Sequence, residues 1–212
     1  MRTPKFPEAN HPLIKSLFHY SDQELLTLFQ DYPEQGKYFI ALFCRYSPIV
    51  HKLIWHSIPS AVQADYIFAS TWRHIFLQMG ELNLSQERQN RVHSFQGWLI
   101  KTTAFCLHNV DVPSVESINY TLKGAPPPLW CYLESALDKL PPVTRLMIIM
   151  AQNFHWSETR IAAYLQAEGE VVSPAAVQIA LQEGYQLLEG HLPEDVCTIY
   201  LTEANQQVTA KV

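Results

Sequence analysis

Two stretches of the sequence interleave aromatic and basic side chains, a combination that suits an unpaired nucleic-acid strand. Exposed bases stack on aromatic faces, and Lys or Arg side chains bind the phosphates of the backbone. The residues of these types are Trp72, Arg73, His74, Phe95, Trp98 and Lys101. Helical spacing also places Trp98, Leu99 and Phe105 on one face of a helix, the usual pattern of a buried core. Arg73 and Lys101 are therefore the stronger candidates for contact with a nucleic acid.

Residue types that support catalysis or metal binding lack the spacing that such chemistry needs. The four cysteines form no Cys-x-x-Cys pair, so we expect reduced, buried thiols. His51 and His56 are separated by five positions, which puts them on different faces of a helix. The sequence contains no P-loop, GxGxxG, GxSxG or HExxH motif, each of which would indicate a known chemistry. We therefore expect no metal, no cofactor and no enzymatic activity.

The composition is that of a globular protein with a hydrophobic core. Of the 212 residues, 48% are hydrophobic and 17% are charged, which excludes intrinsic disorder. A membrane-spanning helix needs about 20 predominantly apolar residues, and no run of the sequence approaches that length. The N-terminal residues also lack the apolar stretch of a secretory signal. We therefore expect a cytoplasmic protein without a membrane span.

The net charge of -5 is distributed unevenly along the chain. Residues 1–130 carry 11 Lys and Arg against 10 Asp and Glu, whereas residues 131–212 carry 4 against 10. The two balances are therefore +1 and -6. Because nucleic-acid binders usually present a basic face, the charge argues against general nucleic-acid binding, most strongly in the second half.

Helical periodicity runs through almost the whole chain, so helices are predicted to position these residues. Ser21 and Glu24 have the spacing of a capping box that opens a helix. Ser47-Pro48 predicts a helix start at that point, because Ser is a favoured cap and Pro a favoured first helical residue. The helices expected in the first half follow Ser21 and then cover 38–46, 49–58, 61–79 and 95–109, with a loop or short exposed helix at 81–93.

A Pro-rich segment separates this region from a second helical region. Residues 110–128 lack periodicity and end in Ala-Pro-Pro-Pro, which favours an extended linker. Helices are predicted over 129–140, 142–153, 157–165 and 174–190, and a last short helix from Pro193. We predict an all-α fold of two small helical domains joined by this linker. The expected boundaries are 1–20 for an N-terminal extension, 21–109 for the first domain, 110–128 for the linker, 129–204 for a helix-turn-helix domain and 205–212 for a flexible tail.

Five short stretches occur in an order that is characteristic of one protein family. They are ALFCRYSPIV (41–50), ADYI (64–67), WRHIF (72–76), FQGWLIK (95–101) and LDKLPP (137–142). The first four resemble the helices of the promoter-melting domain in extracytoplasmic-function (ECF) sigma factors of bacterial RNA polymerase. The fifth resembles the leucine-proline signature that opens the second sigma domain. Residues 157–165 and 173–188 then fall where the helix-turn-helix of that domain belongs.

The resemblance implies a dissociable initiation subunit without small-molecule chemistry. Its first domain would dock on core RNA polymerase and hold unwound promoter DNA, and its second would place a recognition helix in the major groove. An anti-sigma factor or another regulatory protein is a further implied partner. The matching positions are Asp65, Tyr66 and Phe68 for the polymerase, and Arg73, Trp98, Lys101, Ser173, Gln178 and Gln182 for promoter DNA. Asp65 would serve equally well as a solvated residue near a helix N-terminus.

The second domain departs from the family where it should bind DNA. A recognition helix combines base-reading side chains with cations that contact phosphates, but residues 173–190 contain no Lys or Arg and include Glu183 and Glu189. The turn before this helix, predicted over 166–172, is also longer than the usual three or four residues. Two hypotheses follow. The chain is either a sigma factor with an acidic second domain, or a sigma-derived regulator that binds a protein, such as the polymerase or an anti-sigma factor, through that domain.

Overall fold

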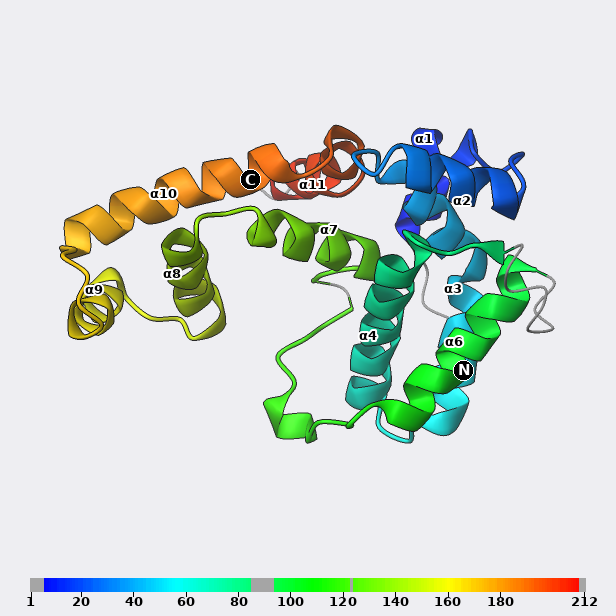
Figure 1. Cartoon of the computed structure of the whole chain (residues 1–212), viewed down its shortest axis with the longest axis horizontal. Helices are drawn as coiled ribbons and strands as arrows, with labels where there is room; N and C mark the ends of the chain where they lie inside the picture. The colour runs from blue at the N-terminus through cyan, green and yellow to red at the C-terminus, as the bar shows by residue number, and fades with distance from the viewer. Residues whose placement is uncertain (1–5, 85–93, 123, 210–212) are drawn as a thin grey trace. The chain divides into compact units, whose positions relative to one another are not determined.

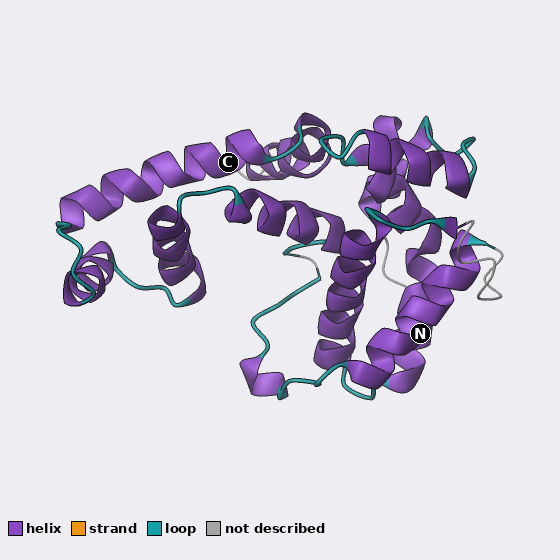
Figure 2. Cartoon of the chain, in the orientation of Figure 1, coloured by secondary structure: helices purple, strands orange, loops and turns teal. Residues whose placement is uncertain are grey.

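The computed structural model describes residues 6–84, 94–122 and 124–209, with the side chains of 202–209 left out. Within these ranges every regular element is a helix and no strand occurs (Figures 1 and 2), which confirms the predicted all-α class. The elements, with η for a 3-10 helix, are η1 (Pro7–Asn10), α1 (Pro12–Lys15), α2 (Asp22–Asp31), α3 (Lys37–Ser57), α4 (Ala61–Met79), α6 (Phe95–Asn109), η3 (Val115–Ser117), α7 (Pro127–Asp138), α8 (Pro142–Asn153), α9 (Glu158–Ala167), α10 (Pro174–His191) and α11 (Glu194–Thr209).

The chain divides into two compact units by the contacts within each. Unit 1 comprises residues 1–131 together with 194–212, and unit 2 comprises residues 132–193. Contacts group residues 6–20 and 110–122 with unit 1, whereas the sequence assigns 1–20 to an extension and 110–128 to a linker. The expected domain boundaries stay a prediction. The expected loop or short helix at 81–93 lies mostly outside the described residues.

The last helix, α11, also belongs to unit 1, although the sequence predicts that it belongs to the second domain. The Asp195 carboxylate accepts hydrogen bonds from the backbone N–H groups of Gly36 and Lys37, at 3.0 and 2.9 Å. The Tyr200 hydroxyl donates to the buried carboxylate of Glu8 at 3.2 Å. These partners are 158 to 192 positions apart in the sequence, so local patterns do not predict the contacts.

Aromatic residues at helical spacing build the core of unit 1, in which α1, α2, α4 and α6 pack against α3. Phe39 and Phe43 face α4 from α3, and their ring centroids lie 6.0 and 4.9 Å from that of Trp72. Phe68, one helical turn before Trp72, is 0% exposed and joins the same core. The side chain of Phe68 therefore has no surface for a partner, contrary to the expectation that it contacts RNA polymerase.

Helix α3 runs without a break through Pro48, so the prediction of two helices separated at Ser47-Pro48 is wrong. An interior proline lacks the N–H that would bond to the carbonyl one turn earlier, which costs about 3 kcal/mol. Tyr46, Val50 and Ile54 are buried on both sides of Pro48, and each buried large side chain stabilises by about 1.5–3 kcal/mol. Burial along the whole helix thus outweighs the local cost of the proline.

Unit 2 is a smaller helical unit in which α10 packs against both α8 and α9. Its core consists of Leu140, Met147, Ile148, Met150, Ile161, Ala162, Leu165, Val177 and Leu181. Ser157 and Ser173 cap α9 and α10 by accepting hydrogen bonds from the backbone N–H groups three residues on. Helix α9 continues to Ala167, so the turn before α10 covers 168–173 and is slightly shorter than predicted.

The glycine in the middle of α10 is required by close packing. A Cβ atom at Gly184 would lie 2.7 Å from Thr144 Cγ2 and 3.1 Å from Ile148 Cδ1. Glycine costs about 1 kcal/mol against Ala in a helix interior, and the close approach of α10 to α8 at this point accounts for its presence. None of the helices within the described residues, α10 included, combines the length and apolarity that crossing a bilayer requires.

Candidate nucleic-acid interface

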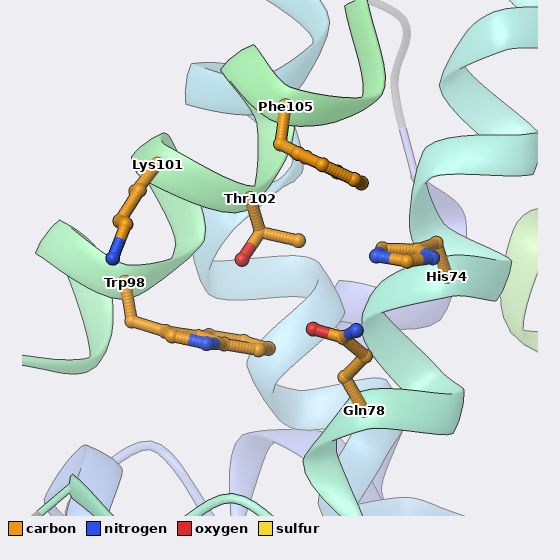
Figure 3. Close-up of a pocket in the computed structure, with 6 residues that line it drawn as sticks. All are labelled: His74, Gln78, Trp98, Lys101, Thr102 and Phe105. Atoms are coloured by element: carbon orange, nitrogen blue, oxygen red, sulfur yellow. The ribbon is translucent and has the colours of Figure 1, made fainter. Parts of the chain in front are cut away.

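A cavity of about 240 Å³ opens in unit 1 between the second half of α4 and helix α6 (Figure 3). It is lined by His74, Gln78, Trp98, Lys101, Thr102 and Phe105. The four residues from α6 follow the i, i+3, i+4, i+7 spacing of a single helix face, and the two from α4 are one turn apart. Helical periodicity aligns the residues within each helix, and the packing of α4 against α6 brings the two sets to one cavity.

Two aromatic groups form opposite sides of the cavity. The rings of His74 and Phe105 stack with centroids 5.9 Å apart and planes 25° from parallel, and Phe105 is 55% exposed. The indole of Trp98 is only 5% exposed, with the ring of Phe95 5.5 Å away on its buried side. Trp98 therefore has a fixed orientation, whereas Phe105 offers a large accessible face.

Polar groups complete the lining. Figure 3 shows the amine of Lys101 beside Trp98 at the cavity edge, and the amide of Gln78 directed into the space. Drug-sized ligands occupy pockets of about 300–1,000 Å³, so this smaller cavity suits one planar group. The exposed ring of Phe105, with a cation and hydrogen-bonding groups nearby, offers what an unstacked base and its phosphate require.

The structure brings together some of the predicted DNA-binding residues and separates others. Trp98 and Lys101 both line the cavity, and Arg73 is exposed on α4 beside His74. Trp72 and Phe95 are buried in the core and offer no stacking surface. Lining residues Gln78, Thr102 and Phe105 are not predicted as site residues, although the spacing of Thr102 and Phe105 from Trp98 could have indicated them.

The remaining two residues predicted to bind polymerase, Asp65 and Tyr66, are half-buried on the first half of α4. Segment 110–128 covers part of this surface, since the side-chain amide of Gln63 donates to the Pro113 carbonyl at 2.8 Å. The rings of Tyr66 and Tyr120 also lie edge to face, 6.5 Å apart. Burial raises the pKa of the Asp65 carboxyl. A half-buried acid held at a desolvation cost is a candidate functional group.

The predicted DNA-binding residues of unit 2 lie on the exposed surface of α10. Ser173, Gln178 and Gln182 are all exposed, and the Ser173 hydroxyl accepts the cap hydrogen bond from the Ala176 N–H. Unit 2 contains three Lys and Arg residues, and none of them is on α10. Arg145 pairs with Asp138 at 2.9 Å. Because phosphate contacts supply most non-specific DNA affinity, this unit is poorly equipped to bind a duplex by itself.

Burial disfavours reactivity at two of the cysteine thiols. All four cysteines are thiols within the described residues, and burial raises the pKa of the Cys44 thiol and of the Cys106 thiol. A raised pKa disfavours the thiolate, which is the reactive form.

No known family model, curated protein or solved structure matches the chain. The interpretation of the cavity and of α10 therefore depends on their geometry and on the ordered stretches of the sequence.

Proposed function

We propose that the chain is a sigma-like transcription initiation protein that binds unpaired promoter DNA at the α4/α6 cavity and core RNA polymerase through the first half of α4. The observation that carries the proposal is the convergence of Trp98, Lys101 and Phe105 with His74 in one cavity. Two of these residues also belong to the FQGWLIK stretch that resembles the promoter-melting domain. Sequence order and cavity chemistry thus support the same function.

The lining favours binding over catalysis. It contains no carboxylate and no thiol, and His74 is its one imidazole. General acid–base chemistry most often uses imidazole and carboxylate groups together, and only one of these two types lines the cavity. Stacking and charge pairing are the interactions that the cavity offers.

Binding of a fluorescent single-stranded oligonucleotide tests the DNA part of the proposal. Phe105→Ala removes an exposed stacking face, and loss of one base stack costs about 1–3 kcal/mol, or roughly 5- to 150-fold in affinity. Lys101→Gln should weaken binding and reduce the slope of log K against log salt by about 0.7. Phe18→Ala and Lys52→Gln are matched controls, since both residues are exposed elsewhere in unit 1.

Unchanged affinity in Phe105→Ala and Lys101→Gln, or equal losses in the two controls, would exclude the cavity as the DNA site.

A transcription assay tests the proposed binding to core RNA polymerase. Addition of the protein to core RNA polymerase should produce specific run-off transcripts from a cognate promoter. Binding to core enzyme without such transcripts would instead support a sigma-derived regulator, an alternative that the absence of Lys and Arg from α10 favours.

A further inference from the structure

Helix α10 of unit 2, labelled in Figure 1, carries exposed residues, some of them apolar, at positions other than those of its core residues Val177, Leu181 and Gly184. Five of these exposed residues define what we call the outer face: Ala176, Ile179, Glu183, Leu187 and Gly190. They are spaced by three and four positions, so they form a single stripe along the helix. Ile179 and Leu187 are 59% and 47% exposed.

The pattern of this stripe is that of a surface that packs against another helix. Single exposed apolar residues are common and need no explanation, but here two large ones flank Glu183 with small residues at both ends. A Cβ atom at Gly190 would meet no atom within 4 Å, so the small residue leaves the surface open. Apolar side chains at three- and four-residue spacing are typical of helix–helix seams, and here Ile179 and Leu187 lie four positions on either side of Glu183.

The negative charge of α10 indicates which kind of partner would bind it. Residues 174–191 include Glu183 and Glu189 and contain no Lys or Arg. Unit 2 as a whole has seven Asp and Glu against three Lys and Arg. A phosphate backbone would be repelled. A second copy of the chain is also disfavoured, because antiparallel pairing centred on Glu183 would set two glutamates against each other.

We propose that the outer face of α10 docks a basic amphipathic helix of a partner protein. Apolar side chains of that helix would cover Ile179 and Leu187, and its Lys or Arg residues would pair with Glu183, which lies between them on the outer face. This is helix recognition through apolar anchors at turn spacing, with charge complementarity at the rim. The proposal concerns unit 2 alone and does not depend on the function of the α4/α6 cavity.

A designed peptide of leucine and lysine provides the probe. It has about 15 residues, the length at which an isolated helix becomes marginally stable, with leucines on one face and lysines on the other. The full-length protein is titrated with this peptide by calorimetry. A peptide of the same composition in scrambled order, and one with Glu in place of Lys, are the comparison ligands, and a duplex oligonucleotide is a third.

Four variants of the protein separate the contributions. Ile179→Gln with Leu187→Gln should weaken binding of the amphipathic peptide by about tenfold or more, the effect of losing two apolar contacts. Glu183→Gln should weaken it several-fold and reduce its salt dependence. The matched controls are Val171→Gln and Glu170→Gln, which change exposed residues of unit 2 outside α10 and should leave binding unchanged.

The outcomes are distinct. Selective loss in the two α10 variants, with wild-type affinity in the controls and weaker binding of both comparison peptides, supports the docking face. Equal binding of the scrambled peptide, or equal losses in Val171→Gln and Glu170→Gln, would overturn the proposal, because attraction would then be a property of net charge. Duplex binding that Gln178→Ala or Gln182→Ala abolishes would also overturn it, because α10 would then be a DNA-reading helix. All altered residues are exposed, so circular dichroism should show unchanged helix content.

Discussion

Asp195 caps a helix from which it is distant in sequence, and its removal should destabilise unit 1. Helix α3 begins after Gly36, which has no side chain to cap it. The two oxygens of Asp195 accept hydrogen bonds from the N–H groups of Gly36 and Lys37. Loss of a helix cap costs about 0.5–2 kcal/mol, and loss of a negative charge at a helix N-terminus adds about 0.3–1 kcal/mol. Since Asp195 is only half-buried, we expect Asp195→Ala to cost about 1–2 kcal/mol.

Thermal unfolding followed by tryptophan fluorescence measures this loss. Four of the five tryptophans belong to unit 1, so the signal reports mainly on that unit. For chains of this size about 1 kcal/mol corresponds to a shift of about 2–4 °C, which gives an expected decrease in Tm of about 2–8 °C. Hydrogen exchange at the amides of residues 36 and 37 should also accelerate in the variant.

Glu194→Ala is the control for Asp195→Ala. It removes the same charge from the neighbouring position, which is exposed and also lies in the first turn of α11. Asp195→Asn retains one acceptor oxygen and should have an intermediate effect. Equal decreases in Tm for Asp195→Ala and Glu194→Ala, or unchanged exchange at residues 36 and 37, would refute the capping explanation and leave only a general effect of charge.

Two further predictions concern α4 and α10. Burial raises the pKa of Asp65, so the folded state holds this proton more tightly than the unfolded chain. The contribution of the Asp65 carboxyl to the free energy of unfolding therefore decreases as pH rises from the usual pKa range of aspartate through the raised pKa. Asp65→Asn should accordingly raise Tm at neutral pH and flatten its pH dependence while weakening polymerase binding; a lower Tm would contradict the desolvation argument. Gly184→Ala should destabilise unit 2 by about 1–3 kcal/mol in urea unfolding because the new Cβ collides with Thr144 and Ile148. Gly190→Ala, where no atom is near, should be neutral or stabilise by up to about 1 kcal/mol, and equal effects of the two changes would exclude packing as the cause.

Helix positions were predictable where local signals determine them. The capping box at Ser21 and Glu24 is present, and the helices over 61–79 and 95–109 have the predicted limits. The break predicted at Pro48 is absent, because burial of neighbouring side chains overrides local propensity. The attachment of α11 to unit 1 depends on pairs such as Asp195 with Gly36, which no local pattern encodes.

In the candidate site, sequence periodicity predicts which residues share a helix face but not which of them are exposed. Periodicity correctly groups Trp98 and Phe105 on one face of α6, but it does not indicate which part of that face a neighbouring helix covers. Trp98 is nearly buried, whereas Phe105 is largely exposed. Phe68 lies close to Asp65 and Tyr66 in the sequence, but its side chain is fully buried in the core. Spacing therefore predicts which residues are neighbours, and packing decides which of them remain accessible.

Charge acquires functional meaning when it is assigned to the compact units instead of to halves of the sequence. Unit 2 contributes seven acidic and three basic residues, whereas unit 1 has nearly equal numbers, 13 and 12. A net charge near zero does not prevent local phosphate binding, because a cation acts over about a Debye length, roughly 8–10 Å. For the proposed DNA binding, the local charge of Lys101 in the cavity lining is therefore more relevant than the total charge of the unit. The same reasoning applies to α10, where Glu183 lies between exposed Ile179 and Leu187 and the helix contains no Lys or Arg. The unit with the predicted recognition helix is thus better suited to a basic protein surface than to the DNA that its position in the sequence suggests.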